Sequence, residues 1–175
     1  MKYVEGDLIK LAKEGIFDVI THGCNCFCTM GAGIAVPMKN NFDCDKFPLE
    51  ALEYKGNINK LGTIDYQIKQ IFLKQKINLL GQEIESTNFG GFSLVVINSY
   101  TQYRYGHNHP DGDYAPVDYD AITMCMRKIN HIFKGKRIGL PKIGCNLAGG
   151  DWNIVSKIIE RELKDMNITI INYKK

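Results

Sequence analysis

Short apolar runs alternate with amphipathic stretches along this chain of 175 residues, and this alternation limits the possible fold more than any other feature. Apolar residues spaced three and four apart predict helices, whereas short continuous apolar runs predict buried strands. The spacing predicts helices at 7–14, 34–42, 118–133 and around 155–163, and strands at 3–4, 17–22, 94–100, 137–143 and 168–173. Such an order is typical of a layered α/β domain with a sheet between helices.

The middle of the chain has a less regular pattern. Residues 61–73 are strand-like in composition, whereas 74–91 mix polar and apolar residues without a clear period. We expect an insertion or an extra hairpin at about 65–92. No linker, repeat or low-complexity tract divides the chain, so we expect a single domain over residues 1–175.

Composition and charge exclude several classes of protein. Hydrophobic residues make up 45% of the chain and charged residues 23%, which excludes a disordered, collagen-like or membrane-spanning chain. The formal net charge of +3 is small and evenly spread, so we expect no obligate nucleic-acid partner, no membrane partner and a monomer. The N-terminal residues have no apolar core of signal-peptide length, and we expect a cytoplasmic location.

Six cysteines raise the question of a metal site, and a reducing cytoplasm predicts that all are free thiols. Three of them form a Cys-x-Cys-x-Cys pattern. Zinc sites more often use two pairs of cysteines, or a cysteine pair with a histidine pair, and neither arrangement occurs here. We therefore expect no metal and no cofactor. The cysteines are Cys24, Cys26, Cys28, Cys44, Cys125 and Cys145.

Two glycine-bearing loops, at 22–33 and 144–151, each follow a predicted strand and precede a predicted helix. Loops of this kind converge at the carboxyl ends of strands, where backbone N–H groups and helix N-termini bind anions. The pattern predicts a phosphate or diphosphate ligand, and two simple tight turns are the alternative. The phosphate-loop motif of nucleotide hydrolases is absent, and Val36 stands at the third glycine position of the dinucleotide fingerprint.

Three blocks in order, at 6–9, 20–35 and 140–152, resemble a macro domain. This resemblance implies a three-layer α/β/α macro-domain fold with a central mixed β-sheet. Within the family, the chain looks most similar to the ADP-ribose 1″-phosphate phosphatases of the fungal and phage type. The resemblance therefore implies a phosphoric monoester hydrolase that binds ADP-ribose 1″-phosphate and releases ADP-ribose and phosphate.

The same resemblance implies which residues bind ADP-ribose. Asp7 matches the acid that accepts a hydrogen bond from the adenine amino group, aided by the backbone at Leu8 and Ile9; a helix N-cap is its other expected role. Ile171 and Tyr173 are both candidates to stack on adenine. The expected residues of the two loops are Cys24, Met30, Gly31, Ala32, Gly33 and Ile34, and then Gly144, Cys145, Asn146, Leu147, Ala148 and Gly149.

Three residues are candidates for catalysis, each with a structural alternative. His22, expected at the end of its strand, is able to titrate near neutral pH and to act as an acid, a base or a phosphate donor, or else to be a hydrogen-bonded structural residue. Asn25 matches the family's polar residue beside the distal ribose, or else stabilises a turn. Asp151 is placed to orient water, or else to cap the following helix.

Two further functions fit the same loops. One is an ADP-ribosyl hydrolase that removes ADP-ribose from modified macromolecules. The branch of the family that acts on glutamate uses a lysine and an aspartate, and Gln102 and Ala148 stand at those positions, so neither a lysine adduct nor the carboxylate is available. The other is a non-catalytic ADP-ribose-binding module.

His107 and His109 lie in a polar, turn-rich loop, and closure over the ligand is a minor expectation for them.

Overall fold

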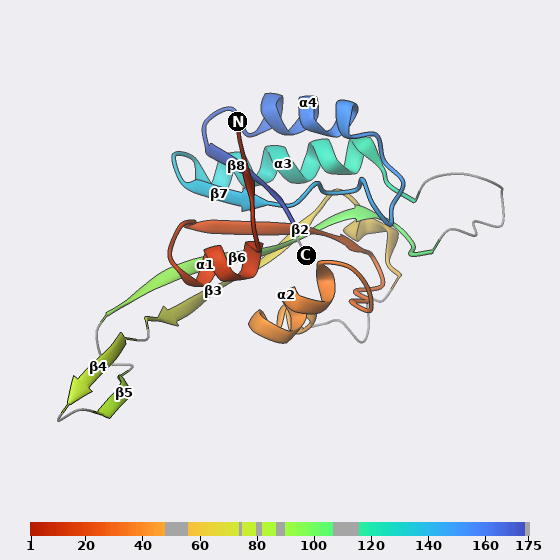
Figure 1. Cartoon of the computed structure of the whole chain (residues 1–175). Helices are drawn as coiled ribbons and strands as arrows, with labels where there is room; N and C mark the ends of the chain where they lie inside the picture. Colours follow the sequence, from red (N-terminus) through yellow and green to blue (C-terminus); the bar gives the residue numbers. More distant parts are fainter. Residues whose placement is uncertain (48–55, 74, 80–81, 87–89, 107–115, 174–175) are drawn as a thin grey trace.

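The computed structural model describes residues 1–47, 56–73, 75–79, 82–86, 90–106 and 116–173. A six-stranded mixed sheet forms the centre, in the order β1-β8-β7-β2-β6-β3 (Figure 1). All neighbouring strands are parallel except β3, which runs antiparallel to β6. The strands are β1 (Lys2–Glu5), β2 (Val19–Asn25), β3 (Ile64–Phe72), β6 (Gly91–Gln102), β7 (Arg137–Leu140) and β8 (Asn167–Asn172).

Two pairs of helices cover the two faces of this sheet (Figure 1). One pair is α1 (Leu8–Lys13) with α2 (Ala35–Phe42), and the other is α3 (Tyr119–Phe133) with α4 (Trp152–Glu162). The predicted three-layer α/β/α architecture is confirmed. Among the described residues, no helix is both long and apolar enough to cross a membrane.

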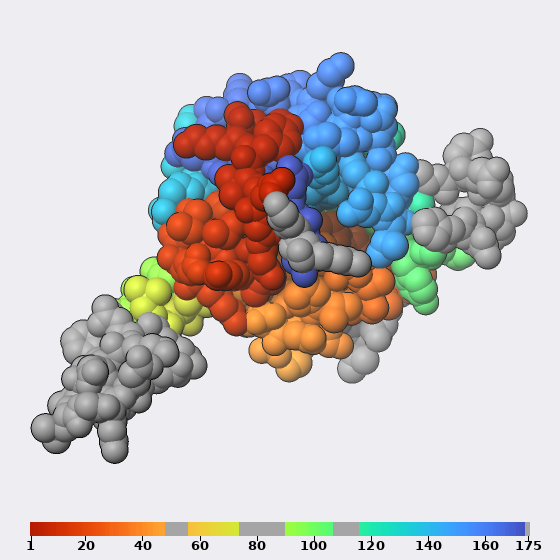
Figure 2. All heavy atoms as spheres, in the orientation of Figure 1, coloured from red at the N-terminus to blue at the C-terminus, as the bar shows by residue number. Residues whose placement is uncertain are grey.

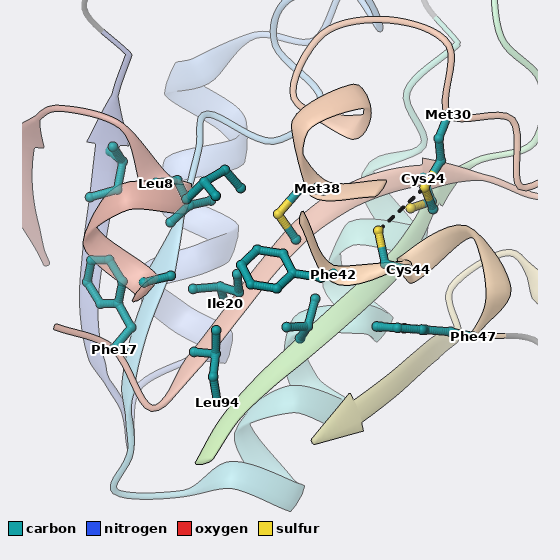
Figure 3. Close-up of a cluster of buried hydrophobic side chains, with 14 of the residues drawn as sticks. Leu8, Phe17, Ile20, Cys24, Met30, Met38, Phe42, Cys44, Phe47 and Leu94 are labelled. Atoms are coloured by element: carbon teal, nitrogen blue, oxygen red, sulfur yellow. Dashed lines mark hydrogen bonds between the residues drawn. The ribbon is translucent and has the colours of Figure 1, made fainter. Parts of the chain in front are cut away.

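Each face of the sheet has its own apolar core, because the central strands are apolar on both faces. In β6, Leu94 and Val96 pack toward α1 and α2, and Ile97 packs toward α3 and α4. Figure 3 shows the first core, in which Phe42 of α2 lies near Ile20 of β2. Full burial of each such side chain contributes on the order of 2 kcal/mol. The continuous apolar run at 94–100 therefore has the expected position.

The range 65–92 contains most of β3, the start of β6 and a separate two-stranded sheet of β4 (Gln75–Leu79) and β5 (Gln82–Ser86). Two short 3-10 helices, at Cys44–Lys46 and Ile58–Lys60, follow α2 and precede β3. The histidine loop at 107–113 lies outside the described residues.

Strand β2 is longer than the sequence predicted. The pattern placed its end at His22, whereas its pairing with β6 continues to Asn25 opposite Gln102. Backbone hydrogen bonds to β6, rather than apolar side chains, hold these last residues in the sheet. The loop that precedes α2 consequently begins after Asn25.

Candidate active site

The loop after β2 and the loop after β7 meet above the carboxyl ends of these adjacent parallel strands. A Cβ built on Gly33 would lie 3.3 Å from Cδ1 of Leu147, so the Leu147 side chain rests on the first glycine loop. Figure 2 shows a hollow between the orange surface of α2 with its loop and the blue surface before α4. The two loops that the sequence singled out thus line one cleft.

The N-terminus of α2 differs from those of the other three helices. Asp7, Asp118 and Asp151 are the N-caps of α1, α3 and α4, and each carboxylate accepts at least one backbone N–H. Helix α2 instead follows Ile34, whose side chain makes no capping hydrogen bond, and its first turn contains no acidic residue. The partial positive charge at this helix end therefore faces the cleft without a protein counter-charge.

Backbone N–H groups are available in the later part of the first loop, next to α2. Within the described part of the chain, the N–H groups of residues 31–36 donate to no protein acceptor. Gly31 has no neighbouring atom within 4 Å of where a Cβ would lie, so the space beside it is open. A row of free donors at a helix N-terminus is a binding site for a phosphate group.

The second loop is held rigidly by its own backbone. Gly150 N–H donates to Gly144 O at 2.7 Å, and Val117 N–H donates to Ala148 O at 3.2 Å. Gly144 has a φ of 74°, and a Cβ there would lie 2.7 Å from Val117 Cγ2, so only glycine fits. The N–H groups of 144 and 146–148 have no acceptor among the residues that the structure describes. This loop is thus a second, preformed set of donors.

Asp7 combines a used and an unused carboxylate oxygen. Its Oδ1 accepts the N–H groups of Ile9 at 2.7 Å and Lys10 at 3.2 Å, while Oδ2 has no partner in the described structure. Gly6 N–H donates to Asn172 O at 3.0 Å, which brings the end of β8 beside this carboxylate. Asp7 is therefore a helix cap that keeps one acceptor free.

The end of β8 offers one accessible aromatic ring. Ile171 is only 3% exposed and packs in the core, whereas Tyr173 is 69% exposed. Of the two stacking candidates, only Tyr173 is accessible to a ligand.

An open hollow of about 460 Å³ lies between α1 and α2, beside Asp7 rather than between the glycine loops. Its lining includes Lys10 and Lys13 but also the acidic Asp7 and Glu14, so its charges balance. Lys13 Nζ donates to Asn41 Oδ1 at 2.6 Å within it. This balanced charge does not favour an anion, and the cleft between the glycine loops remains the better phosphate site.

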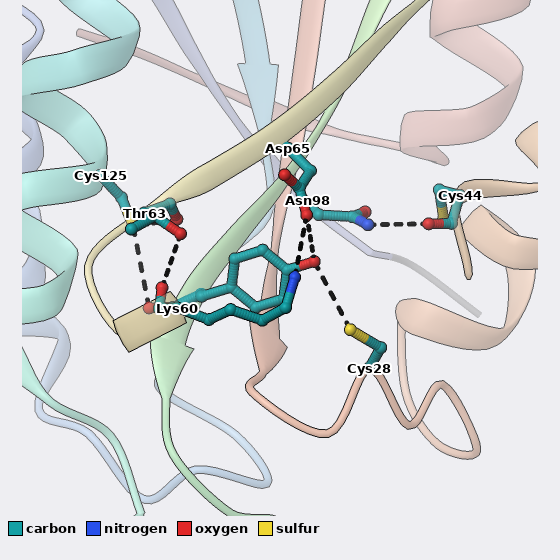
Figure 4. Close-up of polar contacts among 8 residues, drawn as sticks. Cys28, Cys44, Lys60, Thr63, Asp65, Asn98 and Cys125 are labelled. Atoms are coloured by element: carbon teal, nitrogen blue, oxygen red, sulfur yellow. Dashed lines mark hydrogen bonds and ion pairs between the residues drawn. The ribbon is translucent and has the colours of Figure 1, made fainter. Parts of the chain in front are cut away.

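His22 lies inside β2 and is completely buried, not at the end of the strand as the sequence suggested. Its Nε2 is 2.9 Å from Asn98 Oδ1, and Asn98 Nδ2 donates to Cys44 O at 2.7 Å (Figure 4). The amide orientation makes Nε2–H the donor to Asn98 Oδ1. Burial lowers the pKa of His22 to about 4, because the charged form loses its hydration. The ring is therefore a structural donor at neutral pH.

Asn25 and Asp151 both serve the backbone around the cleft. Asn25 Oδ1 accepts the N–H groups of Phe27 at 3.0 Å and Thr29 at 3.2 Å, and Nδ2 donates to Thr29 O at 3.0 Å. Asp151 Oδ1 caps α4 by accepting Asn153 N–H at 2.8 Å, while Oδ2 has no partner among the described groups. Asn25 thus shapes the first loop, and Asp151 presents a free oxygen at the end of the second.

Cys24 and Cys145, the two thiols expected beside the ligand, have raised pKa values and are protonated. Burial raises the pKa of Cys24 well above its ordinary value and that of Cys145 to about 11.

Met30, which was expected to face the ligand, is 8% exposed, and its sulfur lies 3.5 Å from Cys44 Sγ beneath the loop (Figure 3). No group of three or more potential metal ligands occurs in the described ranges.

A buried polar network that the sequence did not indicate supports the first loop from below (Figure 4). Tyr100 O–H donates to Asp65 Oδ2 at 2.6 Å, and Cys28 Sγ lies 3.5 Å from the same hydroxyl. Lys60 Nζ is 3.5 Å from Asp65 Oδ2. Burial and the hydrogen bond to Asp65 raise the pKa of Tyr100 far above its ordinary value. Tyr100 lies 35 positions from Asp65 and 72 from Cys28, so no local pattern signals these two contacts.

Gln102 and Ala148, which were expected at the lysine and aspartate positions of the glutamate-acting branch, supply no catalytic group. Gln102 Nε2 donates to Arg104 O at 2.7 Å, and Ala148 is 5% exposed. The lysine-adduct mechanism has no support in this geometry.

We compared the sequence of this chain with those of known proteins. No family model matches the chain. A protein of Enterobacteria phage T4, described as an uncharacterized 17.5 kDa protein in the tk-vs intergenic region, is 28% identical over 182 residues, covering 99% of this chain and 97% of its own length.

Two solved structures show the fold. The macrodomain of Thermus aquaticus DarG matches with a TM-score of 0.58 and 16% identity, over 99% of this chain and 97% of that one. Thermosipho africanus DarTG in complex with ADP-ribose matches with a TM-score of 0.58 and 18% identity, over 99% of this chain and 41% of that one. With its mixed sheet between two helical layers, the chain has the macrodomain fold.

Proposed function

We propose that the protein binds ADP-ribose, with the diphosphate between the two glycine loops. The observation that carries this proposal is the row of free N–H groups at residues 31–36, at the helix end that no side chain caps. The free amides of 144 and 146–148 lie on the other loop. Such donors neutralise a diphosphate without lysine or arginine. The fold shared with a DarTG structure that contains ADP-ribose supports the same ligand.

The adenine end of the ligand belongs at the other end of the cleft in this proposal. Asp7 Oδ2 accepts a hydrogen bond from the adenine amino group, while Oδ1 continues to cap α1. The backbone at Leu8 and Ile9 lines this subsite, and the exposed ring of Tyr173 stacks on the base. The distal ribose then lies beside the turn that Asn25 shapes.

The activity we propose is hydrolysis of ADP-ribose 1″-phosphate to ADP-ribose and phosphate. Water attacks phosphorus, the bond from phosphorus to the ribose oxygen breaks, and a proton passes to the departing hydroxyl. Phosphoryl transfer depends mainly on positioning and on donors aimed at the phosphoryl oxygens, which the loop amides supply. Asp151 Oδ2 orients the water and Asn25 positions the first loop. His22 donates to Asn98, whose amide donates to Cys44 O in the 3-10 helix after α2.

A non-catalytic binding module is the second candidate. The side chains of His22 and Asn25 are both fully engaged within the protein, and the pKa of His22 is too low for proton transfer near neutral pH. Of the three candidate catalytic residues, only Asp151 keeps a side-chain oxygen without a partner among the described residues. These engaged side chains are the reason to keep, as the second candidate, a protein that holds ADP-ribose without turning over its phosphate ester.

The test combines calorimetry with ADP-ribose and an assay of phosphate release from ADP-ribose 1″-phosphate. We expect binding and phosphate release, unchanged by a chelator. In Asp151→Asn, which keeps a capping oxygen, turnover should fall by about tenfold or more while ADP-ribose affinity stays near that of the wild type. Binding without phosphate release would leave the binding module alone. Absence of ADP-ribose binding would reject both candidates.

A further inference from the structure

Strand β3 is an edge of the six-stranded sheet with unpaired backbone groups. Among the described strands it pairs only with β6. Leu73 N–H donates to Gly90 O, and Thr63 O accepts from Tyr100, so the odd-numbered residues of this segment bond toward β6. In an antiparallel ladder the even-numbered residues then direct their N–H and C=O groups to the open side. These residues present a template for another strand.

Three exposed apolar side chains lie along one face of β3. Tyr66, Ile68 and Phe72 are 44%, 62% and 68% exposed and share one face of the sheet. The strand has nine residues and no proline, whereas the opposite edge strand, β1, has four residues. Long edge strands that no other element covers can pair with other strands.

We propose that two copies of this chain pair antiparallel through β3, about a two-fold axis at Gln67. In this register Asp65 lies opposite Lys69 of the second copy, and Tyr66 lies opposite Ile68 of the second copy. The symmetry makes each of these pairs occur twice. Opposite charges and aromatic pairs with β-branched residues are the favourable cross-strand combinations.

The backbone geometry agrees with this register. Tyr66 and Ile68 are both even-numbered residues, so they face each other as a pair that exchanges two hydrogen bonds across the new edge. Asp65 and Lys69 form the other type of pair, in which side chains approach more closely. Lys69 Nζ lies 5.2 Å from the centre of the Phe47 ring, and as odd-numbered residues Lys69 and Asp65 share one face of the sheet. Asp65 Oδ2 accepts from Tyr100 O–H and lies 3.5 Å from Lys60 Nζ, so Lys69 of the second copy would join an existing group of charges.

A second copy is the occupant that we propose for this edge, because the two-fold register sets Asp65 opposite Lys69 and Tyr66 opposite Ile68. A two-fold pairing also closes at two copies and leaves no free β3 edge. The glycine loops follow β2 and β7, and β6 lies between β2 and β3, so the dimer leaves the cleft open. The inference therefore stands independently of the proposed ligand.

The test is sedimentation velocity over a concentration series, with the monomer mass of 19.8 kDa as reference. We expect the wild type to reach twice this mass and no more. Ile68→Pro removes an outward N–H and leaves the ladder to β6 intact, so it should abolish the dimer. Circular dichroism and ADP-ribose affinity report whether this variant is folded.

A charge pair gives the matched control. Lys69→Glu places a carboxylate opposite Asp65 of the second copy and should raise the dimer dissociation constant about tenfold or more. Lys157→Glu makes the same charge change on α4 and should leave the dimer unchanged. A wild type that stays monomeric throughout, larger assemblies, or equal dimerisation of both lysine variants would each overturn the proposal.

Discussion

The side chain of Leu147 rests on Gly33, across the cleft from its own loop, with Cδ1 3.3 Å from the position of a Cβ on that glycine. This contact sets the distance between the two sets of backbone donors. Gly33 has a φ of 58°, in the left-handed region, so its backbone is also unfavourable for other residues. The geometry of the cleft therefore depends on a glycine at this position.

Gly33→Ala should lower the free energy of unfolding by about 1 kcal/mol, from the left-handed backbone and the crowding against Leu147. ADP-ribose affinity should fall as well, because the loops move apart. Gly31→Ala is the matched control for stability, since its Cβ would meet no atom within 4 Å. Denaturant unfolding of both variants checks the difference, and equal stability of the two would contradict this account.

Ala32→Asp should have opposite effects on stability and binding. Ala32 is exposed and precedes the uncapped N-terminus of α2. A carboxylate there should stabilise the free protein by about 0.5 kcal/mol through the helix dipole, and weaken ADP-ribose binding about tenfold or more by repelling the diphosphate. Thermal unfolding and calorimetry measure the two effects. Ala32→Asn, of similar size but neutral, should bind close to the wild-type affinity; equal losses in both variants would point to steric exclusion instead.

Two substitutions of Asp7 should separate its role as the N-cap of α1 from its proposed role in binding adenine. Asp7→Asn keeps a capping oxygen, so the free energy of unfolding should stay nearly unchanged, while the lost charge weakens ADP-ribose binding. Asp7→Ala removes the cap as well and should cost about 1 kcal/mol of stability. Calorimetry with ADP-ribose and with its hypoxanthine analogue checks the base contact. If both variants keep the wild-type preference for adenine over hypoxanthine, this carboxylate does not contact the base.

His22 should make the folded protein less stable in mild acid. The unfolded chain takes up a proton at this residue near the ordinary pKa of 6.5, whereas the folded protein does so only near 4. Above 6.5 the full stability is present. As the pH falls from 6.5 toward 4, the unfolded state binds the extra proton and stability declines by at most about 1.4 kcal/mol per pH unit.

Denaturant unfolding between about pH 7 and about pH 5 measures this slope. His22→Gln retains a donor for Asn98 but cannot take up a proton. The slope of its unfolding free energy against pH should therefore be smaller by up to the contribution of one proton, whatever the absolute stability of the variant. His131→Gln is the control, because His131 is exposed on α3. An unchanged slope in His22→Gln would show that this histidine is not the group responsible.

The sequence predicted those features that depend only on residues close together in the chain. The apolar spacing at 118–133 predicted α3, found at Tyr119–Phe133, because a helix that buries one face must repeat about every 3.6 residues. Asp151 was expected as a possible cap and caps α4, because an N-cap contacts only the next few residues. Glycine loops between a strand and a helix likewise marked both walls of the cleft.

The remaining features depend on partners distant in the chain. The hydrogen bond from His22 to Asn98 joins residues 76 positions apart, and it turned a candidate acid or base into a buried neutral donor. The network around Tyr100 is equally non-local. The sequence by itself determined the order of elements and the donor loops, since these follow from local periodicity and turn chemistry. Only the tertiary structure decided which helix end stays uncapped toward the cleft, which titratable groups are buried, and which strand is left at the edge, because burial and pairing arise when distant segments meet.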